Sequence, residues 1–341
     1  MNVLVLALLA LIFWFGQPAT GETPAYRLIQ PVQDQSGAVL RSRPGTAYLE
    51  RLDGQRNALP LRRDEVLTTL TELAGGWIAA GTKEDGRSGD LVLISIEGSQ
   101  ATRLLPPEGE GSTFRLRPTI LLRDRVLQGL SWLEGPDIRS MAIHLALKDQ
   151  EGWSDTVEVP RRSGRGQTGL TAVSLADGTS LLVWAEFDGT DDDLFFSRLA
   201  GNSLSAPRRI VANNAVPDIT PSLIATDDDV LLAWGQLEDG DYRIKISRFE
   251  GDSWSSPRTF GPAGAQRPEF RRSGENLNMI YRQAWPRRWI VAELGFDGRS
   301  ERRAGVIENL PDPPVIGRVD AQGIELKWDH ILREAQWGQV P

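Results

Sequence analysis

Residues 181–207 read LLVWAEFDGTDDDLFFSRLAGNSLSAP, and residues 231–257 repeat this stretch as LLAWGQLEDGDYRIKISRFEGDSWSSP. Identical residues stand fifty positions apart in the two copies: Trp184 and Trp234, Ser197 and Ser247, Arg198 and Arg248, and Pro207 and Pro257. A tandem similarity of about 40–50 residues is typical of repeat architectures such as β-propellers, in which each repeat is one small sheet. The repeat indicates an architecture, and it does not by itself indicate a reaction.

Two shorter signals extend the repeat through the chain. The first is a proline followed two residues later by a large apolar residue and, eleven or twelve residues after that, by an aromatic residue. It starts at Pro118, Pro221, Pro268 and Pro314. The second signal is an apolar residue followed by an acid and a glycine, with two looser variants. Its apolar residues are Leu52, Ile96, Leu147, Leu199, Phe249 and Phe296. Their spacing of 44 to 52 residues implies six units.

Each unit is predicted to contain four short strands separated by acidic or glycine-containing turns. Residues 230–234 are apolar throughout, as expected of a strand that is buried on both faces. Residues 243–249 partly alternate between apolar and polar side chains. Pro257 fits an outer strand, where a backbone donor is not needed for pairing. No convincing amphipathic helix occurs after the N-terminal segment, so we expect an all-β protein.

These signals together predict a six-bladed β-propeller of four-stranded antiparallel blades. The two chain ends are expected to share one blade, which closes the ring and removes its open edge, and the closed ring is expected to be a monomer. The blades are predicted at residues 64–115, 116–165, 166–215, 216–265 and 266–311, with 312–341 and 22–63 together forming the sixth. The alternative is a pair of β-sandwich domains, against which the regular spacing argues.

The first 21 residues are predicted to form a secretory signal peptide, followed by a single domain at 22–341. Residues 3–15 are an apolar run of thirteen residues, shorter than the about 20 that a membrane span needs. Ala19 and Gly21 suit cleavage before Glu22, and an uncleaved anchor is the alternative. We expect a periplasmic or secreted protein with no membrane span after cleavage. The chain has no cysteine, which excludes disulfides and thiolate metal sites.

Charge and motifs argue against several classes of partner and cofactor. The formal net charge is −8, whereas a general nucleic-acid-binding protein has a basic balance, so no nucleic-acid partner is expected. His144 and His330 lie far apart, and no set of residues has the spacing of a zinc site. The G-x-G-x-x-G pattern at 164–169 lacks the preceding strand and following helix of a dinucleotide site. We therefore expect no cofactor.

The repeat resembles the blades of sialidase-like propellers and is also similar to those of six-bladed fucose-binding lectins. The resemblance rests on L-x-x-W at 181–184, D-G-x-D at 188–191 and S-R-φ-x-G-x-S-W-S-x-P at 247–257. No sialidase Asp-box (S-x-D-x-G-x-T-W) is present. That family binds a substrate carboxylate with three arginines, and residues 115–118 (RLRP) are similar to its R-I-P motif, which carries one of them. The resemblance implies a glycan-active hydrolase as one candidate function.

Three aspartates of one turn, Asp188, Asp191 and Asp193, form a candidate metal site. Calcium prefers several oxygen ligands from one loop, and carboxylates at this spacing can supply them. A solvated hairpin turn is the simpler interpretation of the same residues, and no metal site is assigned from the sequence.

One face of the predicted ring is expected to bind the ligand. Loops between blades and loops between the second and third strands of a blade meet on that face, around the central channel. The candidate ligand-binding residues there are Arg63, Arg117, Arg161, Arg162, Arg267, Trp285 and Arg287. Arginine suits carboxylate or phosphate groups because its planar fork binds two oxygens at once, and Trp285 can stack on a sugar ring or contact a protein.

The sequence thus favours an exported, non-enzymatic binding module whose partner is a protein or a glycan. No catalytic residue is assigned. The alternatives are a glycan-active enzyme of the sialidase-like class and a structural member of an envelope assembly.

Overall fold

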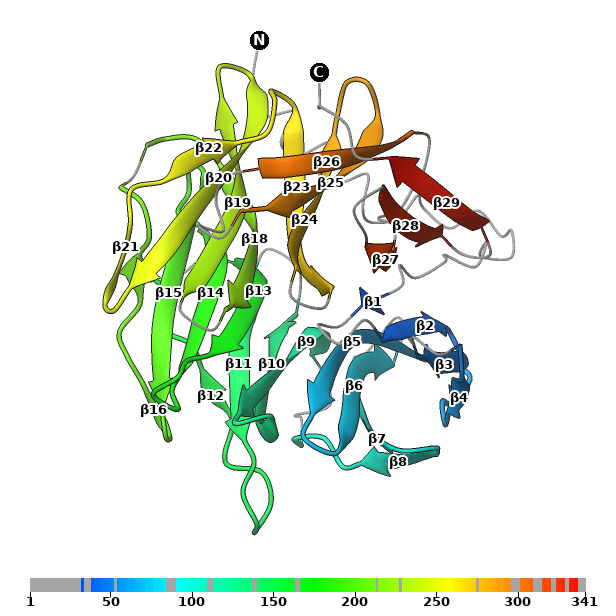
Figure 1. The fold of residues 1–341 in the computed structure, drawn as a ribbon. Helices are drawn as coiled ribbons and strands as arrows, with labels where there is room; N and C mark the ends of the chain where they lie inside the picture. Colours follow the sequence, from blue (N-terminus) through cyan, green and yellow to red (C-terminus); the bar gives the residue numbers. More distant parts are fainter. Residues whose placement is uncertain are drawn as a thin grey trace, which may run out of the picture.

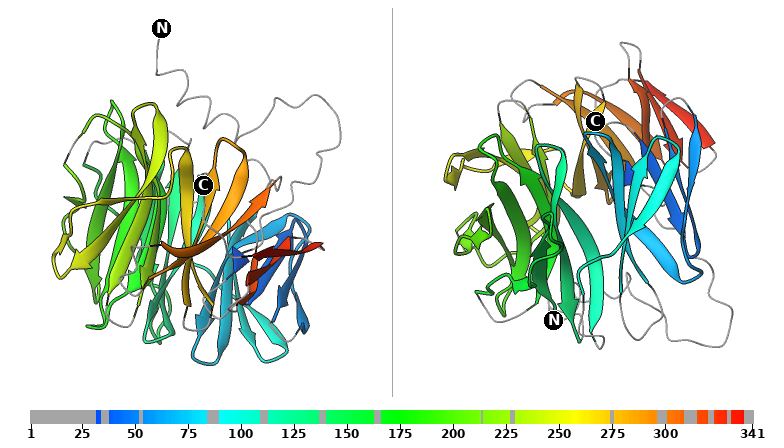
Figure 2. Two further views of the ribbon diagram at one scale, coloured as in Figure 1. Left: turned by 45° about the horizontal axis from the view of Figure 1, so that its top comes forward. Right: turned by 90° about the horizontal axis from the view of Figure 1, so that it is seen from below.

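The computed structural model shows an all-β protein in which consecutive sheets follow one another around a common axis (Figures 1 and 2). It describes residues 32–33, 38–51, 54–83, 90–108, 113–136, 140–162, 166–212, 214–226, 229–273, 276–295, 301–308, 315–319, 323–328 and 331–336. The predicted signal peptide and the candidate cleavage site lie outside the described residues. No helix in the described segments has the length and apolarity needed to cross a membrane.

Six antiparallel sheets form blades 1 to 6 in chain order. Blade 1 contains β1 (Val32–Gln33), β2 (Val39–Arg43), β3 (Thr46–Glu50) and β4 (Arg56–Leu59). Blade 2 contains β5 (Glu65–Leu73), β6 (Gly76–Lys83), β7 (Leu91–Glu97) and β8 (Gln100–Leu104). Blade 3 contains β9 (Phe114–Arg123), β10 (Val126–Gly135), β11 (Ala142–Leu147) and β12 (Val157–Glu158).

The repeated stretch of the sequence lies in blades 4 and 5. Blade 4 contains β13 (Gln167–Ser174), β14 (Ser180–Phe187), β15 (Asp192–Ala200), β16 (Ser203–Leu204) and β17 (Arg208–Arg209). Blade 5 contains β18 (Asp218–Ala225), β19 (Val230–Glu238), β20 (Asp241–Glu250), β21 (Ser253–Trp254) and β22 (Arg258–Phe260). Blade 6 contains β23 (Ala265–Ser273), β24 (Asn276–Gln283), β25 (Arg288–Leu294) and β26 (Glu301–Glu308). The prediction of an all-β propeller with six four-stranded blades is confirmed.

The closure of the ring differs from the expected shared blade. The C-terminal strands β27 (Val315–Val319), β28 (Gly323–Trp328) and β29 (Ile331–Gln336) form a separate three-stranded sheet. This C-terminal sheet contacts blade 6 through β23 and blade 1 through β1. The reason is the number of strands at each end. The N-terminal segment adds β1 and β2 to the two strands expected there, and β29 adds a third strand at the C-terminus, so each end forms a sheet of its own.

The outer strand of blades 4 and 5 is interrupted in the same way. β16 and β17 both pair with β15, and β21 and β22 both pair with β20. Between the pieces of blade 4, Ser205 Oγ accepts a hydrogen bond from Arg198 N at 2.9 Å, and Ser197 Oγ donates to Ser205 O at 2.6 Å. Ser255 makes the same two contacts in blade 5, with Arg248 N at 3.0 Å and Ser247 Oγ at 2.6 Å. The repeated Ser-Arg and Ser-x-Pro residues therefore build an outer-strand bulge.

The repeated aromatic residue of a blade packs against the preceding blade. Trp132, Trp184, Trp234 and Tyr281 are fully buried. Trp184 packs with Ile143 of blade 3, and Trp234 packs with Val183 of blade 4. Burial of one large apolar side chain stabilises the fold by about 1.5–3 kcal/mol. The core therefore lies between neighbouring blades, which explains why an aromatic residue recurs in the second strand of blades 3 to 6.

Candidate functional site

The first strand of four successive blades bends at an equivalent position. The pairing register shifts there between β9 and β10, β13 and β14, β18 and β19, and β23 and β24. The bend residues have positive φ angles: Arg117 (51°), Gly169 (63°), Thr220 (54°) and Arg267 (55°). A left-handed backbone is unfavourable for residues with a Cβ atom, by roughly 1–2 kcal/mol. The bulge is thus a feature of the blade, and two blades place an arginine on it despite the strain.

Arg117 and Arg267 lie close enough to influence one another electrostatically. The pKa of Arg117 is lowered by desolvation and by the charge of Arg267. The Arg117 side chain is nevertheless exposed. Arg117 and Arg267 lie on β9 and β23, which are first strands on the inner side of the ring (Figure 1). The two arginines therefore face a shared, partly desolvated space.

Arg282 and Arg287 belong to the same group of charges. Arg282 is on β24, where its Cα pairs with Gln266 of β23, and Arg287 lies in the β24–β25 turn. Desolvation lowers the pKa of Arg282, and the charges of Arg287 and Arg267 lower it further. We define Arg117, Arg267, Arg282 and Arg287 as the channel-mouth arginines. Like charges at this proximity repel one another, and an anion bound beside them reduces that repulsion.

Arg282 is absent from the residues predicted from the sequence, although the repeat contains a signal for it. Arg282 directly follows the blade aromatic Tyr281, and the residues that follow Trp184 and Trp234 are the small Ala185 and Gly235. In blade 3 the residue after Trp132 is the apolar Leu133. A cation at a position that is small or apolar in blades 3 to 5 departs from the repeat, and such departures mark candidate sites.

The remaining predicted residues of this face lie on other connections. Arg63 and Arg162 are exposed between blades. Arg161 makes an ion pair with Glu158, with its Nη2 2.9 Å from Oε1. Trp285 has 83% of its surface exposed in the same turn as Arg287. The structure links four arginines electrostatically, while the roles of Arg63, Arg161, Arg162 and Trp285 stay predictions.

Arg115, in the same RLRP stretch as Arg117, has a structural role. It is buried, and its Nε lies 3.1 Å from Glu134 Oε2. Its guanidinium carbon stacks 4.9 Å from the ring centroid of Trp132, whose Nε1 also donates to Glu134 at 2.7 Å. Within this stretch, only Arg117 belongs to the channel-mouth arginines.

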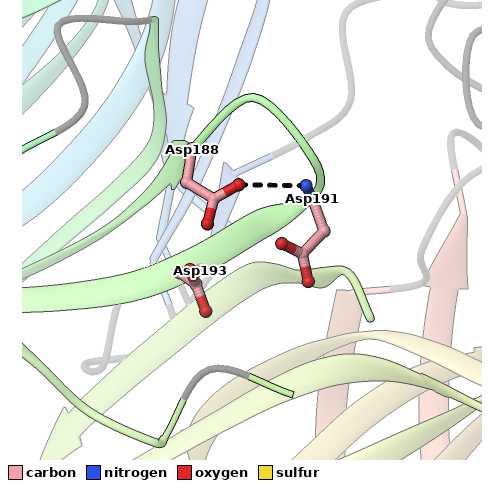
Figure 3. Close-up of side chains that lie close together, drawn as sticks. All are labelled: Asp188, Asp191 and Asp193. Atoms are coloured by element: carbon pink, nitrogen blue, oxygen red, sulfur yellow. Dashed lines mark hydrogen bonds between the residues drawn. The ribbon is translucent and has the colours of Figure 1, made fainter. Parts of the chain in front are cut away.

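A second charged group lies in the β14–β15 connection of blade 4. One carboxylate oxygen each of Asp188, Asp191 and Asp193 lies within 4.8 Å of the others. Figure 3 shows the Asp188 and Asp191 carboxylates facing one another, with Asp193 beside them. Asp191 is 4% exposed and Asp193 is fully buried. The interpretation of these residues as a solvated turn is therefore wrong for two of the three, and we call the group the acidic pocket.

Burial and mutual repulsion raise the pKa values of aspartates in the acidic pocket. Desolvation and the charge of Asp188 raise the pKa of Asp191. Desolvation raises the pKa of Asp193 to about 6, although Arg209 opposes this, with its Nη2 2.9 Å from Asp193 Oδ2. The adjacent Asp192 also has a pKa of about 6, again chiefly because of desolvation. These acids are held together at an electrostatic cost.

Blade 5 contributes a further acid beside this pocket. Asp218 Oδ1 accepts hydrogen bonds from Trp234 Nε1 at 2.7 Å and Gln236 Nε2 at 2.8 Å. Desolvation raises the pKa of Asp218, and the charge of Asp191 raises it further. Asp218 and Arg209 are absent from the residues predicted from the sequence, because their closeness to the turn depends on how neighbouring strands and blades pack.

Comparison with known proteins identifies the fold class alone. No protein-family model matches the chain, and no curated protein sequence matches it. Similar solved structures include a protein of unknown function from Dyadobacter fermentans, with 11% identity and a TM-score of 0.53 over 89% of this chain and 94% of that one. An ulvan lyase bound to a saccharide of glucuronic acid and rhamnose 3-sulfate has 10% identity and a TM-score of 0.53 over 92% and 94%. The polysaccharide lyase Uly1 has 11% identity and a TM-score of 0.52 over 94% and 90%.

These similarities define the chain as a β-propeller whose structural neighbours include polysaccharide lyases. At 10–11% identity they concern the fold and carry no site residues across. The sialidase-like assignment stays a prediction.

Proposed function

We propose that the protein is an exported binding module that recognises an acidic glycan through the channel-mouth arginines. The observation that carries the proposal is the position of Arg267 beside Arg117 and Arg282, because desolvation and the charge of Arg267 lower the pKa of both of these residues. A bound carboxylate or sulfate removes the repulsion between them. Such groups also fit the planar fork of arginine, which donates two parallel hydrogen bonds.

The contrast between this site and the whole chain supports an anionic ligand. The protein has a formal net charge of −8, yet four cations gather where blades 3 and 6 meet the channel. A local positive site in an acidic protein attracts anions to one place and repels them elsewhere. This distribution favours specific recognition over general adhesion to polyanions.

The exposed indole of Trp285 favours a sugar over an inorganic anion. It is 83% exposed in the turn that also carries Arg287. An indole face packs against the apolar face of a sugar ring, while the neighbouring cation binds the acidic substituent. Among the structural neighbours, the ulvan lyase was solved with a saccharide that carries both a carboxylate and a sulfate. That ligand belongs to the chemical class we propose here.

A glycan array with acidic and neutral saccharides tests the proposal. We expect the wild-type protein to bind saccharides that carry uronate or sulfate groups and to leave neutral ones unbound. Arg282→Ala is expected to abolish the signal. Arg123→Ala is the control, because Arg123 is exposed at the β9–β10 hairpin, at the opposite end of the blade. Equal binding to neutral saccharides, or full binding by Arg282→Ala, overturns the proposal.

Product analysis separates binding from catalysis. A binding module leaves the length of a bound acidic polysaccharide unchanged after long incubation. Shortened chains, seen by size-exclusion chromatography, support the glycan-active enzyme instead.

A further inference from the structure

The β14–β15 connection holds three carboxylates in a fixed arrangement. Asp188 Oδ1 accepts a hydrogen bond from Thr190 N at 2.8 Å. It also accepts one from Asp191 N at 3.3 Å, which Figure 3 shows as a dashed line. Asp188 N donates to Asp191 O at 2.9 Å. The connection is thus closed by its own backbone. These hydrogen bonds fix the Asp188 carboxylate and the Asp191 backbone beside one another.

The spacing of the carboxylates matches the coordination sphere of calcium. Oxygen ligands lie about 2.3–2.6 Å from a calcium ion, so two ligands on opposite sides are separated by up to about 5 Å. One oxygen from each of Asp188, Asp191 and Asp193 lies within 4.8 Å of the others. A single ion can therefore contact all three side chains without rearrangement of the connection.

Buried oxygens in this pocket have no hydrogen-bond donor from other parts of the described chain. Asp191 is 4% exposed, and neither of its carboxylate oxygens accepts a hydrogen bond from another described residue. Asp193 Oδ1 likewise accepts no hydrogen bond from another described residue, while Asp193 Oδ2 lies beside Arg209. Buried polar atoms are satisfied in nearly all native structures, and exceptions commonly mark an ion or water position. Asp191 thus has buried carboxylate oxygens that are available to an ion beside the other two carboxylates.

The charge of the pocket attracts a divalent cation. Three carboxylates carry three negative charges, and Arg209 supplies one positive charge from 2.9 Å (Asp193 Oδ2) and 4.0 Å (Asp188 Oδ2). Two negative charges remain on the three candidate ligands, and Asp192 and Asp218 add to the local negative potential. All the candidate ligand atoms are oxygens, which are the ligands of hard cations.

We propose that Asp188, Asp191 and Asp193 bind a calcium ion that fixes the β14–β15 connection of blade 4. Magnesium is the less suitable ion, because it demands octahedral geometry at about 2.0–2.1 Å and keeps most of its waters. The site lies on the face of the channel-mouth arginines but shares no residue with them. The calcium proposal can therefore be tested independently of the proposed glycan recognition.

Calcium titration of the chelator-treated full-length protein tests the site. Isothermal titration calorimetry with CaCl₂ alone is expected to give one ion per chain, and excess calcium is expected to raise the unfolding temperature. Asp191→Asn and Asp193→Asn are expected to weaken calcium binding by about ten-fold or more, because each removes a charged ligand. Asp239→Asn, on the exposed turn at the equivalent place in blade 5, is the control and is expected to bind like the wild type.

The Asp191→Asn variant also tests whether loss of binding reflects loss of the fold. Asparagine removes a buried charge, so the calcium-free variant is expected to unfold at the same temperature as the calcium-free wild type or higher. Calcium is then expected to stabilise the wild type alone. The proposal is overturned if the wild type shows neither heat nor a temperature shift in excess CaCl₂, if Asp191→Asn binds as tightly as the wild type, or if MgCl₂ binds equally well.

Discussion

Arg117 and Arg267 occupy the same bulge in the first strands of blades 3 and 6. Each directly precedes a proline, and their φ angles of 51° and 55° differ little from the 63° of Gly169 at the equivalent place in blade 4. Although two blades lie between theirs in the chain, the charge of Arg267 lowers the pKa of Arg117. Both residues thus combine backbone strain with electrostatic repulsion, and neither feature stabilises the fold.

Arg117→Gly is predicted to remove ligand binding without loss of stability. Glycine adopts the left-handed backbone at no steric cost, which offsets the larger entropy of the unfolded glycine chain. We expect the free energy of unfolding, from urea denaturation, to stay within about 1 kcal/mol of the wild type, on the stabilising side. A loss of more than about 2 kcal/mol would show that the arginine serves the fold. Thr220→Gly, at the same bulge in blade 5, is the matched control and is expected to retain binding.

Trp234→Phe is predicted to destabilise blade 5 through a lost hydrogen bond. The Trp234 indole donates to the buried Asp218 at 2.7 Å, and phenylalanine leaves that carboxylate with one donor fewer. The expected loss is about 1–3 kcal/mol in the free energy of unfolding. Trp184→Phe is the comparison, because its hydrogen bond to Glu186 is longer at 3.4 Å. We expect the smaller loss for Trp184→Phe. The reverse order in urea denaturation would contradict this account.

Glu65 and Arg103 are predicted to make stability depend on acid pH. Burial raises the pKa of Glu65, but hydrogen bonds from Arg103 and Arg62 outweigh it, so the folded pKa is lowered. Both guanidinium–carboxylate distances to Arg103 are 2.7 Å. The stabilisation is complete above the pKa of the unfolded carboxyl and is lost as the pH falls through the lower folded pKa.

Arg103→Met isolates this contribution. At neutral pH it is expected to lose about 1.5–3 kcal/mol, the value of hydrogen bonds to a charged group. Below the pKa of both states the difference from the wild type is expected to shrink. Thermal unfolding followed from neutral to acid pH measures it, and an equal loss at every pH would assign the effect to packing.

The sequence predicted those parts of the fold that repeat, because the residues that recur in each blade are those that every blade needs. Trp184, Trp234 and the two Ser-x-Pro bulges have the same structural roles in neighbouring blades, so their spacing revealed the architecture. The chain ends carry only parts of the repeat, such as the signal from Pro314 to Trp328. No repeat signal predicts strands β1, β2 and β29, and the expected shared blade therefore differs from the two sheets observed.

The candidate site was predictable only in part, for a related reason. Arg117, Arg267 and Arg287 were recognised from the loops that carry them, whereas the contribution of Arg282 depends on strand register. The burial of Asp191 and Asp193 depends on the packing of blade 4 against blade 5, which brings Asp218 beside the turn. A hydrophilic sequence such as DGTDDD contains no sign that such packing follows.

The most direct test of the central claim is calorimetric titration of an acidic oligosaccharide into the wild type and into Arg117→Gly/Arg282→Ala. We predict one binding site in the wild type whose affinity falls as salt rises, because the contacts are ionic. In the double variant we predict a loss of about 3–6 kcal/mol, or at least a hundred-fold, from two charge-assisted contacts. Unchanged affinity in the double variant, or wild-type affinity that is insensitive to salt, would contradict recognition by the channel-mouth arginines.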